Sequence, residues 1–193
     1  MPARLPNWFR RPLLPGTTGS RVKQLLGQHG LHTVCEGAKC PNRAACWHDA
    51  AAAFLILGDT CTRDCGFCAI PHGAVLPPPD PGEPQRLAEA AAGMGLRYVV
   101  VTSVTRDDLP DGGAAHFAAT IHALRARIPG VEVEVLIPDL QGDTTALDIV
   151  LAAQPDILNH NLETVARLQP TVRPQADYAR SLGVLRYAAQ AGA

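Results

Sequence analysis

The sequence has no long hydrophobic run and no excess of charge of either sign. Its longest uncharged apolar stretch, residues 50–58, is far too short to cross a bilayer, so no membrane partner is expected. With 17 basic and 18 acidic residues, it also lacks the positive charge of a typical nucleic-acid-binding protein. A hydrophobic content of 47% is ample for a packed core, which excludes wholesale disorder.

Cysteine is absent from most of the chain. All six cysteines lie between residues 35 and 68, whereas a disulfide framework usually links distant parts of a secreted domain. No apolar signal-peptide segment follows the basic residues of the N-terminus, and the prolines in residues 1–16 disfavour an amphipathic targeting helix. We therefore expect an ordered N-terminal arm and a cytoplasmic protein whose reduced thiols bind metal.

Apolar runs typical of buried strands alternate with helical patterns, which predicts an α/β fold. The predicted strands are residues 54–59, 98–104, 131–137 and 156–159. The predicted helices are residues 20–29, 83–94, 113–128, 144–154 and 178–191. Such alternation predicts parallel strands joined by crossover helices, either in an open sheet or in a barrel. Because about four βα units cannot close an eight-stranded barrel, we expect a chain cut off at its C-terminus. Residues 1–52 are predicted to form a cysteine-bearing extension, and residues 53–193 the core.

One cysteine triplet directly follows the first predicted strand of the core. Its sequence is Cys61-Thr-Arg-Asp-Cys65-Gly-Phe-Cys68. The end of a parallel strand is where α/β folds bind ligands. Three thiolates can hold a [4Fe–4S] cluster, which normally takes four, and so leave one iron open. The alternatives are inert thiols or a zinc site, although zinc favours paired C-x-x-C spacings and only Cys65 and Cys68 have one.

This triplet, C-x3-C-x-aromatic-C after a first strand, resembles that of the radical S-adenosylmethionine (radical SAM) enzymes. The resemblance implies a partial (β/α) barrel in which S-adenosylmethionine binds the open iron. An electron from the cluster would cleave it into methionine and a 5′-deoxyadenosyl radical that abstracts hydrogen. The resemblance also implies cofactor contacts at Thr102 and Ser103, and at Asn161 and Glu163. Capping of the strand by the first pair, and of a following helix by the second, is the alternative.

A second triplet lies upstream, in Cys35-Glu-Gly-Ala-Lys-Cys40-Pro-Asn-Arg-Ala-Ala-Cys46. Its C-x4-C-x5-C spacing supplies three further soft ligands, and the two triplets together resemble those of the lipoyl synthases. The similarity extends to residues 6–10, 31–36, 40–42, 46–47, 106–114, 159–164, 173–174 and 178–182. It implies the insertion of two sulfur atoms at C6 and C8 of a protein-bound octanoyl-lysine. Cys61, Cys65 and Cys68 would then hold a reducing cluster, and Cys35, Cys40 and Cys46 an auxiliary cluster that donates the sulfur.

The resemblance further implies partners for the protein. These are octanoylated lipoyl-carrier domains (2-oxoacid dehydrogenase acyltransferase subunits and the glycine cleavage H protein) and an electron donor such as flavodoxin or ferredoxin. The protein itself is expected to be a monomer. Arg173 and Arg180 would hold a carboxylate or the carrier, unless they are solvated surface residues. The lipoyl synthases take a fourth auxiliary ligand from a serine in an Arg-Ser-x-x-Ser segment. Ser181 belongs to an earlier Arg-Ser-Leu segment, so this fragment is expected to bind clusters without necessarily turning over.

Other interpretations remain open at this point. Asp107, Asp108 and Asp111 resemble a carboxylate cluster, although turn and helix-cap roles are favoured around Leu-Pro and Gly-Gly. A sulfurtransferase resembling biotin synthase would lack the upstream triplet. A ferredoxin-like carrier would supply four cysteines to each cluster, and a zinc-binding interaction module is the remaining alternative.

Overall fold

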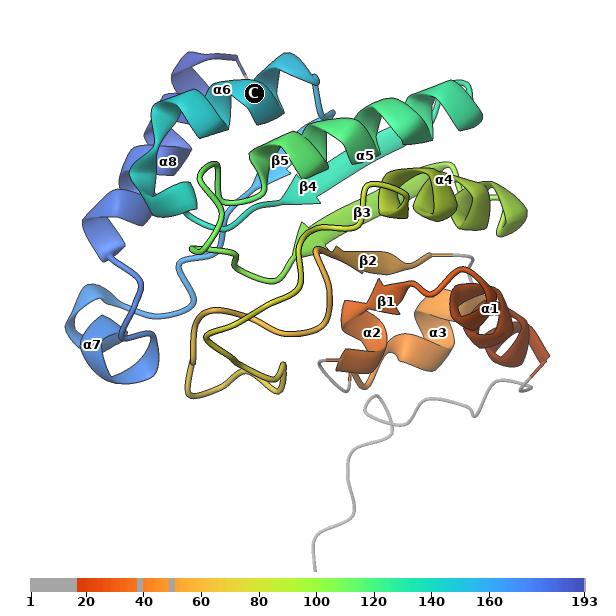
Figure 1. The fold of residues 1–193 in the computed structure, drawn as a ribbon, viewed down its shortest axis with the longest axis horizontal. Coiled ribbons are helices and arrows are strands. Elements are labelled where there is room, and N and C mark those ends of the chain that lie inside the picture. Colours follow the sequence, from red (N-terminus) through yellow and green to blue (C-terminus); the bar gives the residue numbers. More distant parts are fainter. Residues whose placement is uncertain (1–16, 38–39, 49–50, 193) are drawn as a thin grey trace, which may run out of the picture.

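The computed structural model describes residues 17–37, 40–48 and 51–192 (Figure 1). The expected ordered arm and the similarity at residues 6–10 lie outside this part of the chain. The N-terminal extension consists of short elements: α1 (Thr17–Gln28), β1 (His32–Thr33), α2 (Val34–Gly37) and α3 (Arg43–His48). Only α1 was predicted, because the other three elements are too short to show a periodic pattern.

The core alternates strands and helices as predicted. Its elements are β2 (Ala53–Ile56), α4 (Glu83–Gly93), β3 (Tyr98–Ser103), α5 (Ala114–Arg127), β4 (Glu132–Leu136), α6 (Thr144–Ala152) and β5 (Ile157–Asn159). They are followed by α7 (Gln169–Val172) and α8 (Tyr178–Gln190), with short 3-10 helices η2 (Leu140–Gly142) and η3 (Ala166–Leu168) in the loops. The first core strand ends earlier than predicted, because Leu57 and Gly58 have φ angles of 68° and 97°.

The order of the strands identifies the architecture as a partial barrel. They are arranged β1-β2-β3-β4-β5, with β2 to β5 parallel and β1 antiparallel to β2. Each crossover therefore steps to the next strand in the same direction, which places all the crossover helices on one face. In Figure 1, α4, α5 and α6 lie along the same side of the sheet. A doubly wound sheet would instead reverse its strand order and carry helices on both faces. The five strands do not close on themselves.

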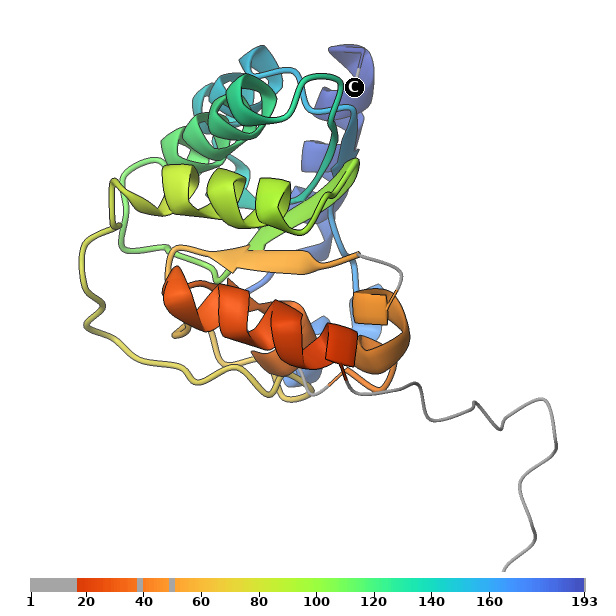
Figure 2. The same cartoon turned by 90° about the vertical axis from the view of Figure 1, so that its right-hand side faces the viewer.

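The main core lies between the sheet and these helices (Figure 2). The alternating residues Val99 and Val101 of β3, and Val133 and Val135 of β4, are fully buried. They pack with fully buried side chains of α4 and α5, namely Leu87, Phe117, Ile121 and Leu124. This packing fixes the strands, and so it fixes where the loops at their C-terminal ends emerge.

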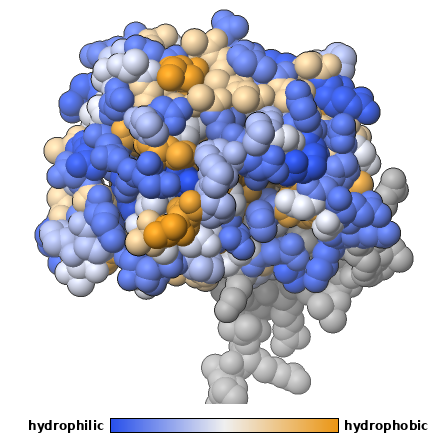
Figure 3. All heavy atoms as spheres, in the orientation of Figure 1, coloured by the Kyte–Doolittle hydropathy of each residue, from blue (hydrophilic) through white to orange (hydrophobic). Residues whose placement is uncertain are grey.

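The surface is mixed in character. Hydrophilic residues cover most of the face shown in Figure 3, with hydrophobic residues gathered in several patches among them. None of the helices in the described residues has the length and apolar character needed to cross a membrane.

Candidate functional site: a three-cysteine loop at the edge of the sheet

A long loop without helix or strand joins β2 to α4 and carries Cys61, Cys65 and Cys68. Glu83, at the start of α4, anchors the beginning of this loop. Its Oε2 accepts a hydrogen bond from the backbone N–H of Leu57 at 2.9 Å and lies 2.7 Å from Nε2 of His116. The chain therefore leaves β2 in a fixed direction, toward the C-terminal edge of the sheet.

Cys61 is held by backbone contacts on two sides. Its N–H donates to the carbonyl of Pro71 at 2.8 Å, and its carbonyl accepts from the N–H of Gly73 at 3.0 Å. Its Sγ accepts hydrogen bonds from the N–H of Thr105, beyond β3, at 3.3 Å and from that of Arg63 at 3.4 Å. These contacts fix the position of the first sulfur atom of the triplet.

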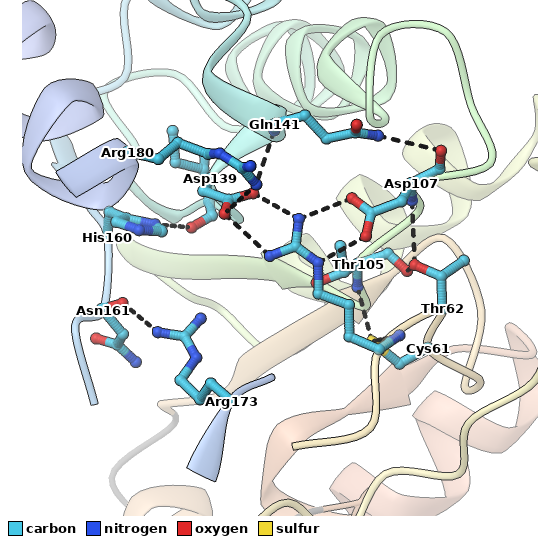
Figure 4. Close-up of polar contacts among 12 residues, drawn as sticks. Cys61, Thr62, Thr105, Asp107, Asp139, Gln141, His160, Asn161, Arg173 and Arg180 are labelled. Atoms are coloured by element: carbon cyan, nitrogen blue, oxygen red, sulfur yellow. Dashed lines mark hydrogen bonds and ion pairs between the residues drawn. The ribbon is translucent and has the colours of Figure 1, made fainter. Parts of the chain in front are cut away.

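The rest of the triplet contacts the segment that follows β5. The N–H of Gly66 donates to the carbonyl of Val172 at 3.0 Å, and Arg173 donates to the carbonyl of Asn161 at 2.8 Å (Figure 4). Burial raises the pKa of the Cys65 thiol, the neighbouring thiols of Cys61 and Cys68 raise it further, and Arg173 opposes them. A bound cation would favour the Cys65 thiolate and so oppose the effect of burial.

Between Cys61 and Cys65, Arg63 is buried in an ion-pair network that extends across the edge of the sheet. Its guanidinium binds Asp107, from the loop after β3, and Asp139, from the loop after β4. In Figure 4 these two carboxylates point toward the same guanidinium. Sequence analysis missed Arg63 and Asp139. The available indication was that ionisable side chains follow three successive parallel strands, whose ends meet at one edge.

The second triplet lies in the N-terminal extension. Cys35 is buried in α2, Cys40 and Cys46 are half-buried, and the N–H of Cys40 donates to the carbonyl of Cys35 at 3.2 Å. All six cysteines are free thiols. Across residues 17–37, 40–48 and 51–192, no three His, Cys, Asp or Glu side chains are gathered as ligands of a single metal ion.

The two cysteine-bearing segments meet at a cavity of about 300 Å³. One wall comes from the extension and includes Leu31, Glu36 and Gly37, and the opposite wall includes Asp59 and Ile70 of the long loop. The contact is close, because a Cβ added to Gly37 would lie 2.6 Å from Cδ1 of Ile70. The pairing of β1 with β2 fixes the extension against the core at this place.

The sequence model of the Radical SAM superfamily matches residues 55–193, which include the end of β2, the Cys61–Cys65–Cys68 triplet and strands β3 to β5. The chain belongs to the radical SAM superfamily. The resemblance inferred from the cysteine spacing is confirmed, and so is the partial (β/α) barrel.

Several lipoyl synthases are similar to this chain along nearly its whole length. That of Oleidesulfovibrio alaskensis is 58% identical over 189 residues, which cover 98% of this chain and 65% of the relative. That of Chlorobium chlorochromatii is 54% identical and covers 96% of this chain and 63% of the relative. That of Methylococcus capsulatus is 56% identical, with coverages of 95% and 57%. The chain therefore spans between 57% and 65% of the length of these three relatives.

Membership of the radical SAM superfamily implies a [4Fe–4S] cluster and S-adenosylmethionine as cofactors. The residues present fit the cluster, since three free thiols share one loop and cysteine is its usual ligand. They also fit a polar ligand beside it, because the same edge carries buried polar atoms with no hydrogen-bond partner in the described residues. These atoms are Oγ of Ser103, Nε2 of His160 and Nε of Arg173.

The predicted contacts for S-adenosylmethionine differ in how their side chains are engaged. Ser103 ends β3 with its hydroxyl unpartnered among the described residues, whereas the Thr102 hydroxyl donates to the carbonyl of Leu136 at 2.8 Å. Arg180, on α8, donates to Asp139 at 3.4 Å and so extends the Arg63 network. The role of each residue in binding the cofactor stays a prediction.

Asn161 and Glu163 bind each other and cap no helix. The Asn161 amide donates to Oε1 of Glu163 at 2.8 Å, and Glu163 has a φ of 61°. The next helical turn, η3, begins after Val165 with no side-chain cap. The alternative that they cap a following helix is therefore wrong, because no helix of normal length follows β5 directly.

The three aspartates after β3 do not act together. Asp111 accepts from the N–H groups of Gly113 and Ala115 at the start of α5, which confirms the expected cap. The expectation is wrong for the other two, because Asp107 pairs with Arg63 and Asp108 with Arg106 at 2.8 Å. Both arginines are buried, and each requires a carboxylate to compensate its charge.

Proposed function

We propose that this chain carries the catalytic core of a lipoyl synthase, which inserts sulfur at C6 and C8 of a protein-bound octanoyl-lysine. The observation that carries the proposal is the cavity whose walls come from both cysteine-bearing segments. A second triplet, on a segment that shares this cavity with the loop of the superfamily's own triplet, supports a reaction that needs two metal centres. The identity of 50–58% with lipoyl synthases along nearly the whole chain supports the same assignment.

When bound, the reduced cluster and S-adenosylmethionine supply hydrogen abstraction from an unactivated C–H bond, and an auxiliary cluster supplies sulfur. The chain's own residues hold and orient these groups. Cys61, Cys65 and Cys68 would ligate the reducing cluster, with the N–H of Thr105 beside the first thiolate. Cys35, Cys40 and Cys46 would ligate the auxiliary cluster.

The polar residues at the edge of the sheet would orient S-adenosylmethionine. Ser103 has a hydroxyl at the end of β3 with no partner among the described residues, and the carbonyl of Asn161 accepts a hydrogen bond from Arg173. Thr102, Glu163 and Arg180 are further proposed contacts to this ligand. Each of them already has a hydrogen-bond partner in the protein. We therefore expect them to orient S-adenosylmethionine and to contribute little to its affinity.

The cavity between the extension and the long loop supports binding of the substrate's acyl chain. Leu31, Leu55, Ile70 and Pro71 provide apolar walls for a medium-length acyl chain. The substrate would be presented by octanoylated lipoyl-carrier domains, such as those of 2-oxoacid dehydrogenase acyltransferases and the glycine cleavage H protein. A flavodoxin- or ferredoxin-type donor would supply electrons to a monomeric cytoplasmic enzyme.

The test uses two matched triple variants of the purified chain, each reconstituted anaerobically with iron and sulfide. We expect about eight irons per molecule in the unsubstituted chain. About four should remain when Cys61, Cys65 and Cys68 are changed to alanine, and about four when Cys35, Cys40 and Cys46 are changed instead. Of these two variants, only the one that keeps Cys61, Cys65 and Cys68 should still form 5′-deoxyadenosine from S-adenosylmethionine and dithionite.

An octanoylated carrier protein separates lipoyl synthase chemistry from other radical SAM chemistry. Sulfur gain by the carrier, measured by mass spectrometry, should require Cys35, Cys40 and Cys46 in addition to the reducing triplet. Sulfur insertion that persists without the upstream triplet would overturn the proposed role of that triplet. Stoichiometric zinc with no iron in the unsubstituted chain would overturn the proposed function.

A further inference from the structure

Arg63 has a fixed geometry because all of its contacts are made inside the protein. Its side chain is only 3% exposed, and its guanidinium donates to four carboxylate oxygens. Nε and Nη2 bind the two oxygens of Asp107 at 2.6 and 2.8 Å. Nη1 and Nη2 bind the two oxygens of Asp139 at 3.0 and 2.6 Å. Two bidentate pairs fix both the position and the plane of the guanidinium.

These contacts connect three successive strand ends. Arg63 belongs to the loop after β2, Asp107 to the loop after β3 and Asp139 to the loop after β4. The neighbouring residue Thr62 reinforces the first connection, since its hydroxyl donates to the carbonyl of Thr105 at 3.0 Å and accepts from the N–H of Asp107 at 3.1 Å. The cysteine loop is therefore attached to the barrel strands through the residues between its first two cysteines.

Asp139 is itself held in place by the loop that carries it. Its Oδ1 accepts from the N–H of Gln141 at 3.1 Å, and the Gln141 side chain donates to the carbonyl of Asp107 at 3.2 Å. Leu140 and Gln141 have φ angles of 45° and 54°, a strained conformation for residues other than glycine. Strain of this kind persists only where surrounding contacts enforce it.

Global stability does not explain an arrangement of this kind. Burying two carboxylates and a guanidinium carries a desolvation penalty, which the ion pairs only roughly offset. Apolar side chains in place of all three charged groups would fill the same space without that penalty. What apolar side chains lack is directional bonding, because they cannot hold the loop in one orientation as two bidentate ion pairs do.

We propose that Arg63 is a positioning residue, which holds Cys61 and Cys65 at the edge of the sheet so that the loop is already arranged to retain its cluster. This proposal rests on the proposed function only in that the triplet binds a [4Fe–4S] cluster. Asp107 and Asp139 hold the guanidinium of Arg63 in place. Because Arg63 lies two residues from each of the two cysteines, its fixed position restrains theirs. Because Arg180 adds a second positive charge to the two negative carboxylates, the network is neutral when complete.

The experiment isolates the reducing cluster by changing Cys35, Cys40 and Cys46 to alanine. In this background, Arg63→Met is compared with Leu124→Ala, which changes a fully buried residue of α5 that lies outside the cysteine loop. Both substitutions should lower the stability of the fold. The melting temperatures of the two variants without iron show whether they are destabilised to a similar extent. The informative readouts are the rate of iron loss to a chelator and the electron paramagnetic resonance spectrum of the reduced cluster.

Arg63→Met should lose iron about 10- to 100-fold faster than Leu124→Ala at a similar melting temperature, with an altered spectrum. Arg63→Lys should restore little, because an ammonium cannot bind two carboxylates bidentately. If Arg63→Met does not fold, Asp107→Asn replaces it, since the Asp107 side chain is 29% exposed and the Arg63–Asp139 pair remains.

Two outcomes would overturn the proposal, and they are distinguishable. Iron retention in Arg63→Met as slow as in Leu124→Ala would reduce Arg63 to a structural residue and leave the cluster site intact. A background protein that binds no iron although it is folded would remove the cluster site, and the role of Arg63 with it.

Discussion

At the scale of single residues, His160 is a buried titratable group that neither set of cysteines uses. Its Nδ1 lies 2.9 Å from the carbonyl of Ile137, and its Nε2 has no hydrogen-bond partner in the part of the chain that the structure describes. Burial lowers the pKa of His160, with an opposing contribution from the bond to Ile137 and the charge of Asp139. The folded protein therefore favours the neutral imidazole.

The direction of this shift predicts how stability changes with pH. Below about pH 6.5, the usual pKa of histidine, the unfolded chain takes up a proton that the folded chain resists. The free energy of unfolding should therefore fall as the pH decreases from about 6.5 through the lower pKa of the folded state. His160→Asn keeps an N–H donor for Ile137 but does not titrate. The free energy of unfolding of this variant, measured with urea, should therefore depend less strongly on pH in this range. An equal dependence on pH in the two proteins would show that His160 is not its source.

Residues are predictable from sequence when their chemistry is local. The cysteine triplets are recognisable because the three cysteines of each triplet lie within a short stretch of chain. Arg63 was not recognisable as buried, because its carboxylate partners lie 44 and 76 residues further along the chain. Only the fold brings these groups together. It also places the Ser103 hydroxyl at the C-terminal end of β3, where it has no partner among the described residues.

At the scale of elements, the pattern located the long helices and parallel strands within a few residues, since they bury regular apolar faces. The conformations of the loops between them depend on backbone angles and close contacts, which show no periodic pattern in the sequence. Gly112 and Gly113, before α5, have φ angles of 60° and 94°. A Cβ at Gly113 would lie 2.3 Å from Cδ1 of Leu57, at the end of β2. This turn brings α5 directly against the start of the cysteine loop.

Gly113→Ala should consequently destabilise the fold by roughly 2 kcal/mol or more, through both backbone strain and the clash with Leu57. The matched control is Gly183→Ala in α8, where a Cβ meets no atom within 4 Å. Alanine at that helical position should stabilise the protein by about 0.5–1 kcal/mol. Chemical denaturation of both variants measures the difference. A Gly113→Ala protein as stable as the unsubstituted chain would mean that Leu57 moves aside at little cost.

At the scale of the whole molecule, the strand order decided what periodicity left open. Apolar runs show that strands are buried, but they do not show whether successive strands step in one direction or reverse. The antiparallel pairing of His32 with Leu55 and Thr33 with Phe54 was also beyond prediction, because two residues show no alternation. That pairing is nevertheless what joins the extension to the barrel and places its cysteines beside the core.

The same connectivity predicts how binding of iron spreads through the molecule. Hydrogen exchange should slow on reconstitution in residues 61–73 and also in residues 105–107 and 139–142, because Thr62, Arg63 and Gln141 bond these loops to one another. The exchange rates of amides in β3 and β4 should change little, because the hydrogen bonds of the sheet and the packing of the core already protect them. Mass spectrometry of exchanged peptides measures this, with the Cys61, Cys65 and Cys68 alanine variant as control. Protection confined to the cysteine loop would mean that the three strand-end loops respond to the metal independently. Coordinated protection would mean that the edge of the barrel acts as one unit, in which the Arg63 network fixes the position of the cysteine loop relative to the sheet.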